Sequence, residues 1–114
     1  MSKNTKEYQR EASRKHYLAN KESIMARSKL ARKRLSQYVA ELKASTPCKD
    51  CNQTYPSYVM DFDHLPEHKK VAEIPLLIKA GSSKKLMEEI KKCDIVCSNC
   101  HRIRTHTRRS SLIG

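Results

Sequence analysis

The sequence predicts a small α+β domain, held together by zinc, that follows a basic helical arm. Two Cys-x-x-Cys motifs, Cys48 to Cys51 and Cys97 to Cys100, have the spacing of a zinc site made of four thiolates. Hydrophobic residues make up 38% of the 114 residues, with one Phe and no Trp, so the core must be small and would need a metal to stabilise it. Residues 1–46 contain neither Gly nor Pro, as is typical of a helical segment.

The charge of the chain indicates a polyanionic partner. Its 24 Lys and Arg against 12 Asp and Glu give a formal net charge of +12, and nucleic acid is the first candidate. A protein that is merely basic is the alternative. No hydrophobic run has the length of a membrane span and no basic, then apolar leader opens the chain, so we expect a soluble, cytoplasmic protein without a membrane partner. In that compartment paired cysteines favour zinc over disulfides.

Residues 1–46 form the predicted arm, with 12 basic and four acidic side chains. Their apolar residues fit one helical stripe only toward the end of the segment, and Asn20 is a plausible break or N-cap. We therefore expect a loosely ordered first helix and a firmer one over about 21–44. Cations along such an arm, Arg27 and Arg34 among them, would contact phosphates without reading the base sequence. The alternative is a solvated charged helix or a disordered basic tail.

The segment 55–64 is the predicted β-structure of the domain. It is rich in β-branched and aromatic side chains and has the composition of a short strand or hairpin. Alternation along that strand would turn Met60 and Phe62 toward the small core. Asp61 and Asp63 would then lie on the open face of the strand.

The remaining segments of the predicted core domain, residues 47–109, are mainly connector and helix. Residues 67–83 are expected to form a connector, and helices are expected over about 84–92 and over 101–109. Residues 110–114 are expected to be a flexible tail. The buried side of the helix over 84–92 is expected to be formed by Leu86, Met87 and Ile90.

The four cysteines of the two motifs form a closed shell of sulfur ligands, Cys48, Cys51, Cys97 and Cys100. A zinc ion in such a shell has no open position for substrate, so it is structural and does not catalyse. Cys93 is expected to be a small buried side chain, because the gap from Cys97 to Cys100 matches the first motif better.

Three residues of the core domain can divide the tasks of phosphodiester hydrolysis. Asp63 and His101 would hold a divalent ion such as Mg²⁺ or Mn²⁺, which keeps water and phosphate oxygens among its ligands. His64 lies at the exit of the strand, where it can swing toward a substrate and take a proton from water. Asp61 is a possible second carboxylate. An Asp-His pair is by itself more often a surface pair, and its position between two zinc motifs is what favours a site.

The succession of Cys-x-x-Cys, Asp-His and Cys-x-x-Cys-His resembles the HNH endonucleases that carry a zinc-stapled ββα-metal motif. The match lies in Met60–Leu65 and Cys97–Arg102, and it is most similar to the small versions common in bacteriophages. The resemblance implies metal-dependent hydrolysis of double-stranded DNA, in the host cytoplasm if the chain is phage-encoded. It implies that His64 is the general base and that Asp63 and His101 are metal ligands.

The chain departs from that family at the middle Asn of the HNH name. This Asn usually lies a few residues before the second cysteine motif, where the chain has Lys92, Cys93 and Asp94. Asn99, inside the motif, is the candidate to serve in its place. Four arginines after the second cysteine motif are expected to bind the DNA backbone near the scissile bond. They are Arg102, Arg104, Arg108 and Arg109.

Two classes of function remain from the sequence. One is an endonuclease that nicks or cuts DNA, and the other is a non-catalytic zinc ribbon that binds nucleic acid with its basic arm. Net charge and zinc fit both classes. Only the Asp-His pair and the His that follows Cys100 favour the enzyme, since a binding protein has no need of them.

Overall fold

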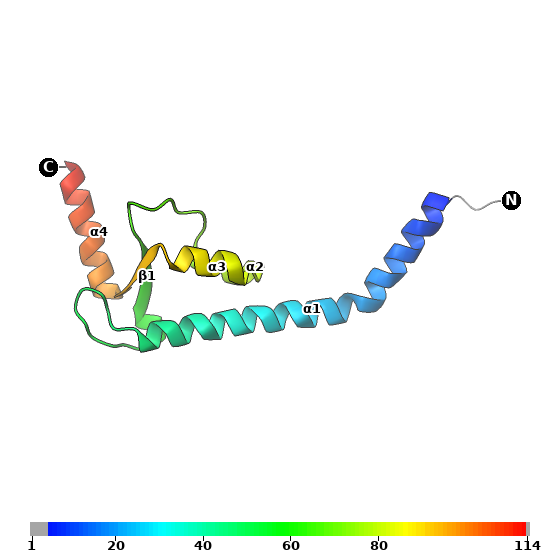
Figure 1. Cartoon of the computed structure of the whole chain (residues 1–114), viewed down its shortest axis with the longest axis horizontal. Coiled ribbons are helices and arrows are strands. Elements are labelled where there is room, and N and C mark those ends of the chain that lie inside the picture. The colour runs from blue at the N-terminus through cyan, green and yellow to red at the C-terminus, as the bar shows by residue number, and fades with distance from the viewer. Residues whose placement is uncertain (1–4, 114) are drawn as a thin grey trace. The chain divides into compact units, whose positions relative to one another are not determined.

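The computed structural model describes residues 5–113, which contain four α-helices, one 3₁₀ turn and a two-stranded antiparallel sheet (Figure 1). In chain order the elements are α1 (Thr5–Ser45), η1 (Ser57–Val59), β1 (Met60–His64), α2 (Ile74–Ala80), α3 (Ser83–Ile90), β2 (Cys93–Cys97) and α4 (Ser98–Ile113). The predicted small α+β class is confirmed. The chain divides into two compact units, one up to Ala31 and one from Arg32 onward.

The first unit is helical over all its described residues, and Figure 1 shows α1 as a continuous coil. The predicted break at Asn20 is wrong, because the Asn20 side chain donates a hydrogen bond to the carbonyl of His16 at 2.7 Å and so lies within the helix. No side chain from residue 5 to residue 31 is buried. None of the helices among residues 5–113 combines the length and the apolar character that crossing a membrane requires.

The second unit begins inside α1, and its larger core joins α1 to the two short helices. Val39 of α1 packs with Ile74 and Leu77 of α2 and with Leu86 of α3, and Leu35 lies against the same cluster. The last third of the predicted arm therefore belongs to the folded domain. Its side chains cover a core that would otherwise be open to water on that side.

A second core surrounds the sheet and the cysteines. It consists of Cys48, Met60, Val96 and Cys97, all buried. Strand β1 pairs antiparallel with β2 in a register that sets Met60 opposite Cys97 and His64 opposite Cys93. This register brings the start of β1 to the junction between β2 and α4, where the second cysteine motif lies.

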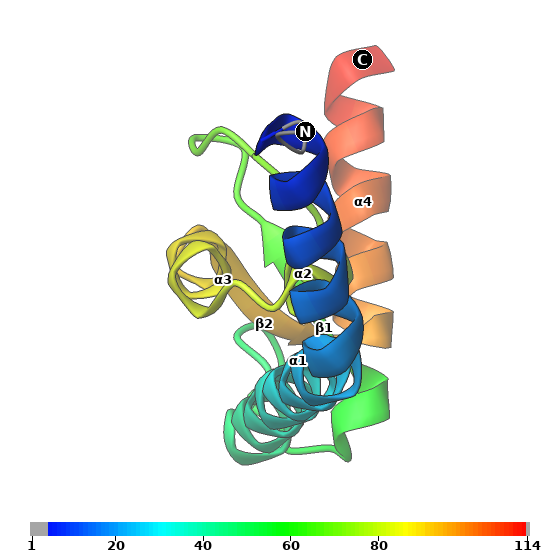
Figure 2. The same cartoon turned by 90° about the vertical axis from the view of Figure 1, so that its right-hand side faces the viewer.

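The two strands lie between α3 and α4, as both views show (Figures 1 and 2). Successive side chains of a strand point to opposite faces. Phe62 accordingly packs on the larger core. Asp61 and Asp63 lie on the other face, which α4 covers, so that Asp63 is only 3% exposed. The predicted open face for Asp63 is therefore wrong, since α4 packs its arginines on it.

Three further expectations differ from the structure. The connector contains α2, which begins with Pro75 in its first turn and ends at Gly81 in the left-handed conformation (φ 70°). Helix α4 continues to Ile113, past the predicted end at Arg109. Met87 of α3 is 39% exposed, and Glu89 is buried in its place. The inward positions of Met60 and Leu86 are confirmed, as both side chains are fully buried.

We predict that Leu86→Ala lowers the free energy of unfolding by about 2–5 kcal/mol, because it leaves a cavity in the larger core. Leu86 is 0% exposed, whereas Leu76 of α2 is 59% exposed and provides a matched Leu→Ala control. The measurement is urea unfolding of the zinc-loaded chain followed by circular dichroism. Equal effects of the two substitutions would contradict the assigned core.

Candidate metal centre and adjoining polar cluster

The four cysteines of the two motifs come together in the structure as the sequence predicts. One sulfur from each of Cys48, Cys51, Cys97 and Cys100 lies within 4.8 Å of the other three, and the sulfurs of Cys51 and Cys97 are 4.0 Å apart. Tetrahedral zinc with Zn–S bonds of about 2.3 Å separates its sulfurs by roughly 3.8 Å. The four thiols are therefore positioned to hold one metal ion, consistent with a structural zinc.

Backbone amides donate hydrogen bonds to two of the four sulfurs. The Cys97 amide donates to the sulfur of Cys48 at 3.2 Å, and the Cys100 amide donates to the sulfur of Cys97 at 3.5 Å. Asn52 adopts the left-handed conformation (φ 61°) that turns the first motif back on itself, with its amide bonded to the Cys48 carbonyl. Burial opposes ionisation of Cys48, yet the surrounding backbone amides lower its pKa to about 6. The thiolate is the form that binds zinc.

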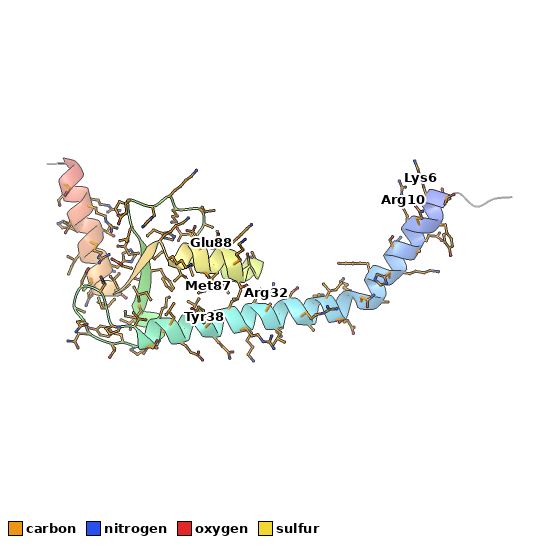
Figure 3. All side chains as sticks on the ribbon, viewed as in Figure 1. Lys6, Arg10, Arg32, Tyr38, Met87 and Glu88 are labelled. Carbon is orange, nitrogen blue, oxygen red and sulfur yellow. The ribbon has the colours of Figure 1, made fainter. Side chains whose placement is uncertain are left out.

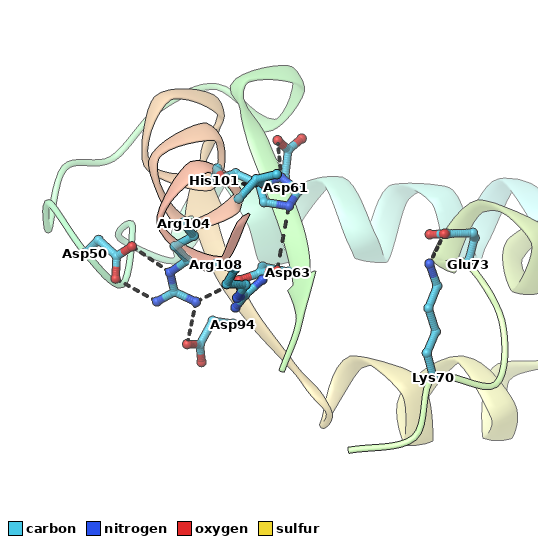
Figure 4. A network of polar contacts seen from close by, with 10 residues as sticks. Asp50, Asp61, Asp63, Lys70, Glu73, Asp94, His101, Arg104 and Arg108 are labelled. Atoms are coloured by element: carbon cyan, nitrogen blue, oxygen red, sulfur yellow. Dashed lines mark hydrogen bonds and ion pairs between the residues drawn. The ribbon is translucent and has the colours of Figure 1, made fainter. Parts of the chain in front are cut away.

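Asp63 is the centre of a polar cluster between β1 and α4 (Figure 4). Its two oxygens accept hydrogen bonds from both terminal nitrogens of Arg108 at 2.8 Å. A third bond comes from Arg104 at 2.9 Å. Burial works against ionisation of Asp63, but the two guanidinium groups keep its pKa below the ordinary value. This aspartate is therefore an ionised, buried anchor for α4.

Arg104 joins three elements through three carboxylates. Its Nε and Nη2 bond both oxygens of Asp50 in the first cysteine motif at 2.6 Å, and its Nη1 bonds Asp63 on β1 and Asp94 on β2. The sequence prediction gave Arg104 a contact with nucleic acid, whereas in the structure its donors are committed to these carboxylates. Asp50 and Asp94 were not predicted as site residues, because nothing in their local sequence indicates a shared partner far along the chain.

His101 lies in the first turn of α4, between the two carboxylates on the same face of β1. Its Nδ1 is 3.0 Å from Asp61 Oδ2, and its Nε2 is 3.7 Å from Asp63 Oδ1. The structure thus brings together Asp63 and His101, and it adds Asp61, as the sequence left open. Two carboxylates and an imidazole are suitable ligands for a hard divalent ion. Both oxygens of Asp63 are bonded to Arg108, so an ion at Asp63 would compete with that guanidinium group.

The cysteine cluster and the acidic set of Asp61, Asp63 and His101 differ in how well their ligand atoms are placed to bind a metal ion. Among the residues that the structure describes, the four cysteines are the one group of three or more His, Cys, Asp or Glu side chains that is placed to hold a metal ion. The acidic set is held by hydrogen bonds and guanidinium groups instead. An ion bound there would compete with these contacts.

His64 makes its contact on the opposite face of β1 from Asp63. Its Nε2 lies 2.9 Å from Oε2 of Glu89 on α3, and its side chain is 13% exposed. The predicted free swing of His64 is therefore wrong in this structure, because the ring is held by Glu89. No hydrogen bond or ion pair joins His64 to Asp63 or His101 among the contacts of the described residues.

Glu89 is the residue that the sequence prediction missed. Its side chain is 3% exposed, and its other oxygen accepts a hydrogen bond from Lys92 at 2.6 Å. The Lys92 ammonium, with help from His64 and the Val71 amide, lowers the pKa of Glu89 to about 2. A sequence signal was present: Glu89 lies three positions after Leu86, on the side of the helix that faces the core.

The other predicted contact residues lie at the surface. The side chain of Asn99 is exposed and belongs neither to the four-cysteine cluster nor to the polar cluster around Asp63. The remaining arginines expected to bind phosphates are likewise exposed and are available to a partner. They are Arg27 and Arg34 on α1 and Arg102 and Arg109 on α4.

Comparison of the chain with protein-family models, with curated proteins and with solved structures finds no match.

We predict that Arg108→Gln lowers the free energy of unfolding at neutral pH by about 1–2 kcal/mol, because a charged hydrogen-bonded pair is lost but is partly screened by solvent. Arg108 is 37% exposed, and Arg109→Gln, at an exposed neighbour, is the matched control. The folded-state pKa of Asp63 is depressed, so its contribution is present above about pH 4 and is lost as the pH falls. Thermal unfolding from pH 7 to pH 3 should show the difference between wild type and variant shrinking in acid. A difference that grows in acid would contradict the assignment.

Proposed function

We propose that the chain is a metal-dependent endonuclease of the HNH type that hydrolyses phosphodiester bonds of DNA. The observation that supports this best is the set of Asp61, Asp63 and His101 on one face of β1, directly beside the four-cysteine centre. His64 follows Asp63 at the end of the same strand. The resemblance noted in the sequence assigns metal binding to Asp63 and His101 and proton abstraction to His64.

The proposed site would lie at the open edge of β1. The sheet has two strands, so β1 is paired with β2 along one edge only. Neighbouring residues of a strand are about 3.8 Å apart at their Cα atoms, although their side chains point to opposite faces. A phosphate placed at the open edge would therefore have Asp63 on one side and His64 on the other.

In the proposed reaction His64 accepts a proton from the attacking water, and the water oxygen forms the new bond to phosphorus. A divalent ion held by Asp63 and His101 would supply positive charge to the phosphate and to the leaving 3′ oxygen. The bond from phosphorus to the 3′ oxygen breaks, the leaving oxygen takes a proton from solvent water to become the 3′-hydroxyl, and the phosphate stays on the 5′ end. This polarity follows from the line of attack opposite the 3′ oxygen.

Arg108 would change partner in this reaction. Its guanidinium at present forms a bidentate pair with Asp63, the same geometry that guanidinium adopts with phosphate. When an ion takes Asp63, the displaced guanidinium can bind the substrate phosphate instead. Arg108 is accessible enough for this exchange, whereas Arg104 is 18% exposed and held by three carboxylates.

Non-specific affinity for DNA would come from the basic helix of the first unit. Lys6 and Arg10 project from one side of α1 (Figure 3), and their spacing of four residues is repeated by Arg14. Such a row can follow a phosphate backbone without reading bases.

The second candidate is a non-catalytic, zinc-organised module that binds nucleic acid. It is favoured by the fact that Asp63 and His64 both have internal partners that account for their presence without catalysis. On this account Asp63 anchors α4, and His64 joins β1 to α3. The two candidates differ in whether the phosphodiester bond is broken.

We predict that the zinc-loaded chain nicks supercoiled plasmid in the presence of Mg²⁺ or Mn²⁺ and leaves 5′-phosphate and 3′-hydroxyl ends. His64→Ala should reduce the nicking rate by at least about 100-fold, because the general base is lost, with DNA affinity unchanged. His106→Ala, at an exposed position of α4, is the matched control and should keep its activity. Gel electrophoresis of the plasmid and filter binding provide the two measurements.

Wild-type protein that binds DNA but does not nick it with either metal would rule out the nuclease in favour of the binding module. Ends of the opposite polarity would contradict the proposed line of attack.

A further inference from the structure

We propose that Glu89 is a positioning residue that holds the His64 ring and fixes its tautomer, so that Nδ1 is the nitrogen left to act as the base. This inference rests on the proposed function, in which His64 is the general base. It assigns a role to a buried carboxylate that the mechanism above leaves unused. The geometry that supports it lies entirely within the second unit, on the face of β1 that packs against α3.

The contact between Glu89 and His64 is short and shielded from water. Nε2 of His64 lies 2.9 Å from Oε2 of Glu89, and the glutamate side chain is 3% exposed. A carboxylate this deep in a small domain is costly unless its oxygens are satisfied. The contacts that Glu89 makes offset this cost.

The remaining contacts of Glu89 hold it ionised and in place. Its Oε1 accepts from Lys92 at 2.6 Å, and the Val71 amide lies 3.4 Å from Oε2. Lys92 also donates to the Lys69 carbonyl at 2.8 Å. The connector after β1 is thus tied to the same carboxylate as the histidine. The hydrogen bond from the Lys92 ammonium has the largest influence on Glu89 and lowers its pKa to about 2.

An ionised carboxylate can only accept hydrogen bonds. Nε2 of His64 must therefore carry the proton that is shared with Glu89, and in the neutral ring Nδ1 is left with the free lone pair. The nitrogen that can take a proton from water is thereby determined by Glu89. A histidine without this partner would exchange between two tautomers, only one of which presents a base in the required direction.

Two other titratable groups, Glu73 and Cys93, lie near this pair. Glu73, at the start of α2, is close enough to His64 to interact with it electrostatically, and it is paired with Lys70. Cys93 lies opposite His64 on β2, and burial raises the pKa of its thiol to about 11, so that it is uncharged at neutral pH. Neither group hydrogen-bonds the imidazole, which leaves Glu89 as the residue that sets its orientation.

The test combines a tautomer measurement with kinetics on the full zinc-loaded chain. Long-range ¹H–¹⁵N spectra should show neutral wild-type His64 protonated at Nε2. Glu89→Gln should yield a mixture of tautomers and lower kcat for plasmid nicking by roughly 10–100-fold, with KM changed much less, because an outer partner of the reacting group is lost. Glu88→Gln is the matched control, since Glu88 is the exposed neighbour on α3 (Figure 3).

Wild-type His64 protonated at Nδ1 would overturn the inference, and so would E89Q protein that cleaves with the wild-type kcat. The tautomer spectrum needs no variant, so the inference stays testable if E89Q does not fold. Absence of cleavage by the wild type would remove the nuclease, which is a different result. In that case Nε2–H in the wild type and a mixture of tautomers in E89Q would still support the positioning of His64, whereas an Nδ1–H tautomer in the wild type would overturn it.

Discussion

The structure of the second unit depends on a cluster of four cysteine sulfurs. One pair lies just after the end of α1 and the other at the junction of β2 and α4, and they are brought within 4.8 Å of one another. Cys48 and Cys97 are also half of the smaller core, with Met60 and Val96. A core of this size gives little stability by itself, so a metal that joins both cysteine pairs would supply much of what keeps the sheet and α4 together.

The polar clusters follow from this constraint. Once the second motif fixes the first turn of α4 beside β1, the next turns place Arg104 and Arg108 over Asp63. Arg104 reaches back to Asp50 in the first motif, so the same guanidinium strengthens the link that the sulfurs make. On the other face of β1, α3 presents Glu89 to His64. The strand thus separates an arginine–aspartate cluster from a glutamate–histidine pair.

Motif and strand patterns predicted part of the fold. The two Cys-x-x-Cys motifs predicted the four-cysteine cluster although it joins distant segments, because both motifs carry the usual ligands of one metal ion. Strand alternation predicted the inward side of Met60. Packing between distant segments that share no such motif was not predicted: Asp63 was expected at an open face, but α4 covers it. Glu89 was overlooked because a glutamate in a charged helix is normally solvated, and only the tertiary contact with His64 shows its role. Asn20 was expected to break α1, because an Asn side chain can hydrogen-bond the backbone at a helix end. In the structure it makes such a bond inside the helix.

We propose that one zinc ion with four sulfur ligands organises the second unit. X-ray absorption at the zinc edge of the purified protein reports both the type and the distance of the ligands. We expect one zinc per chain, surrounded by four sulfurs at about 2.3 Å. A shell that includes nitrogen or oxygen would contradict it, since a cysteine would then be free and a histidine or carboxylate assigned here to another role would hold the metal.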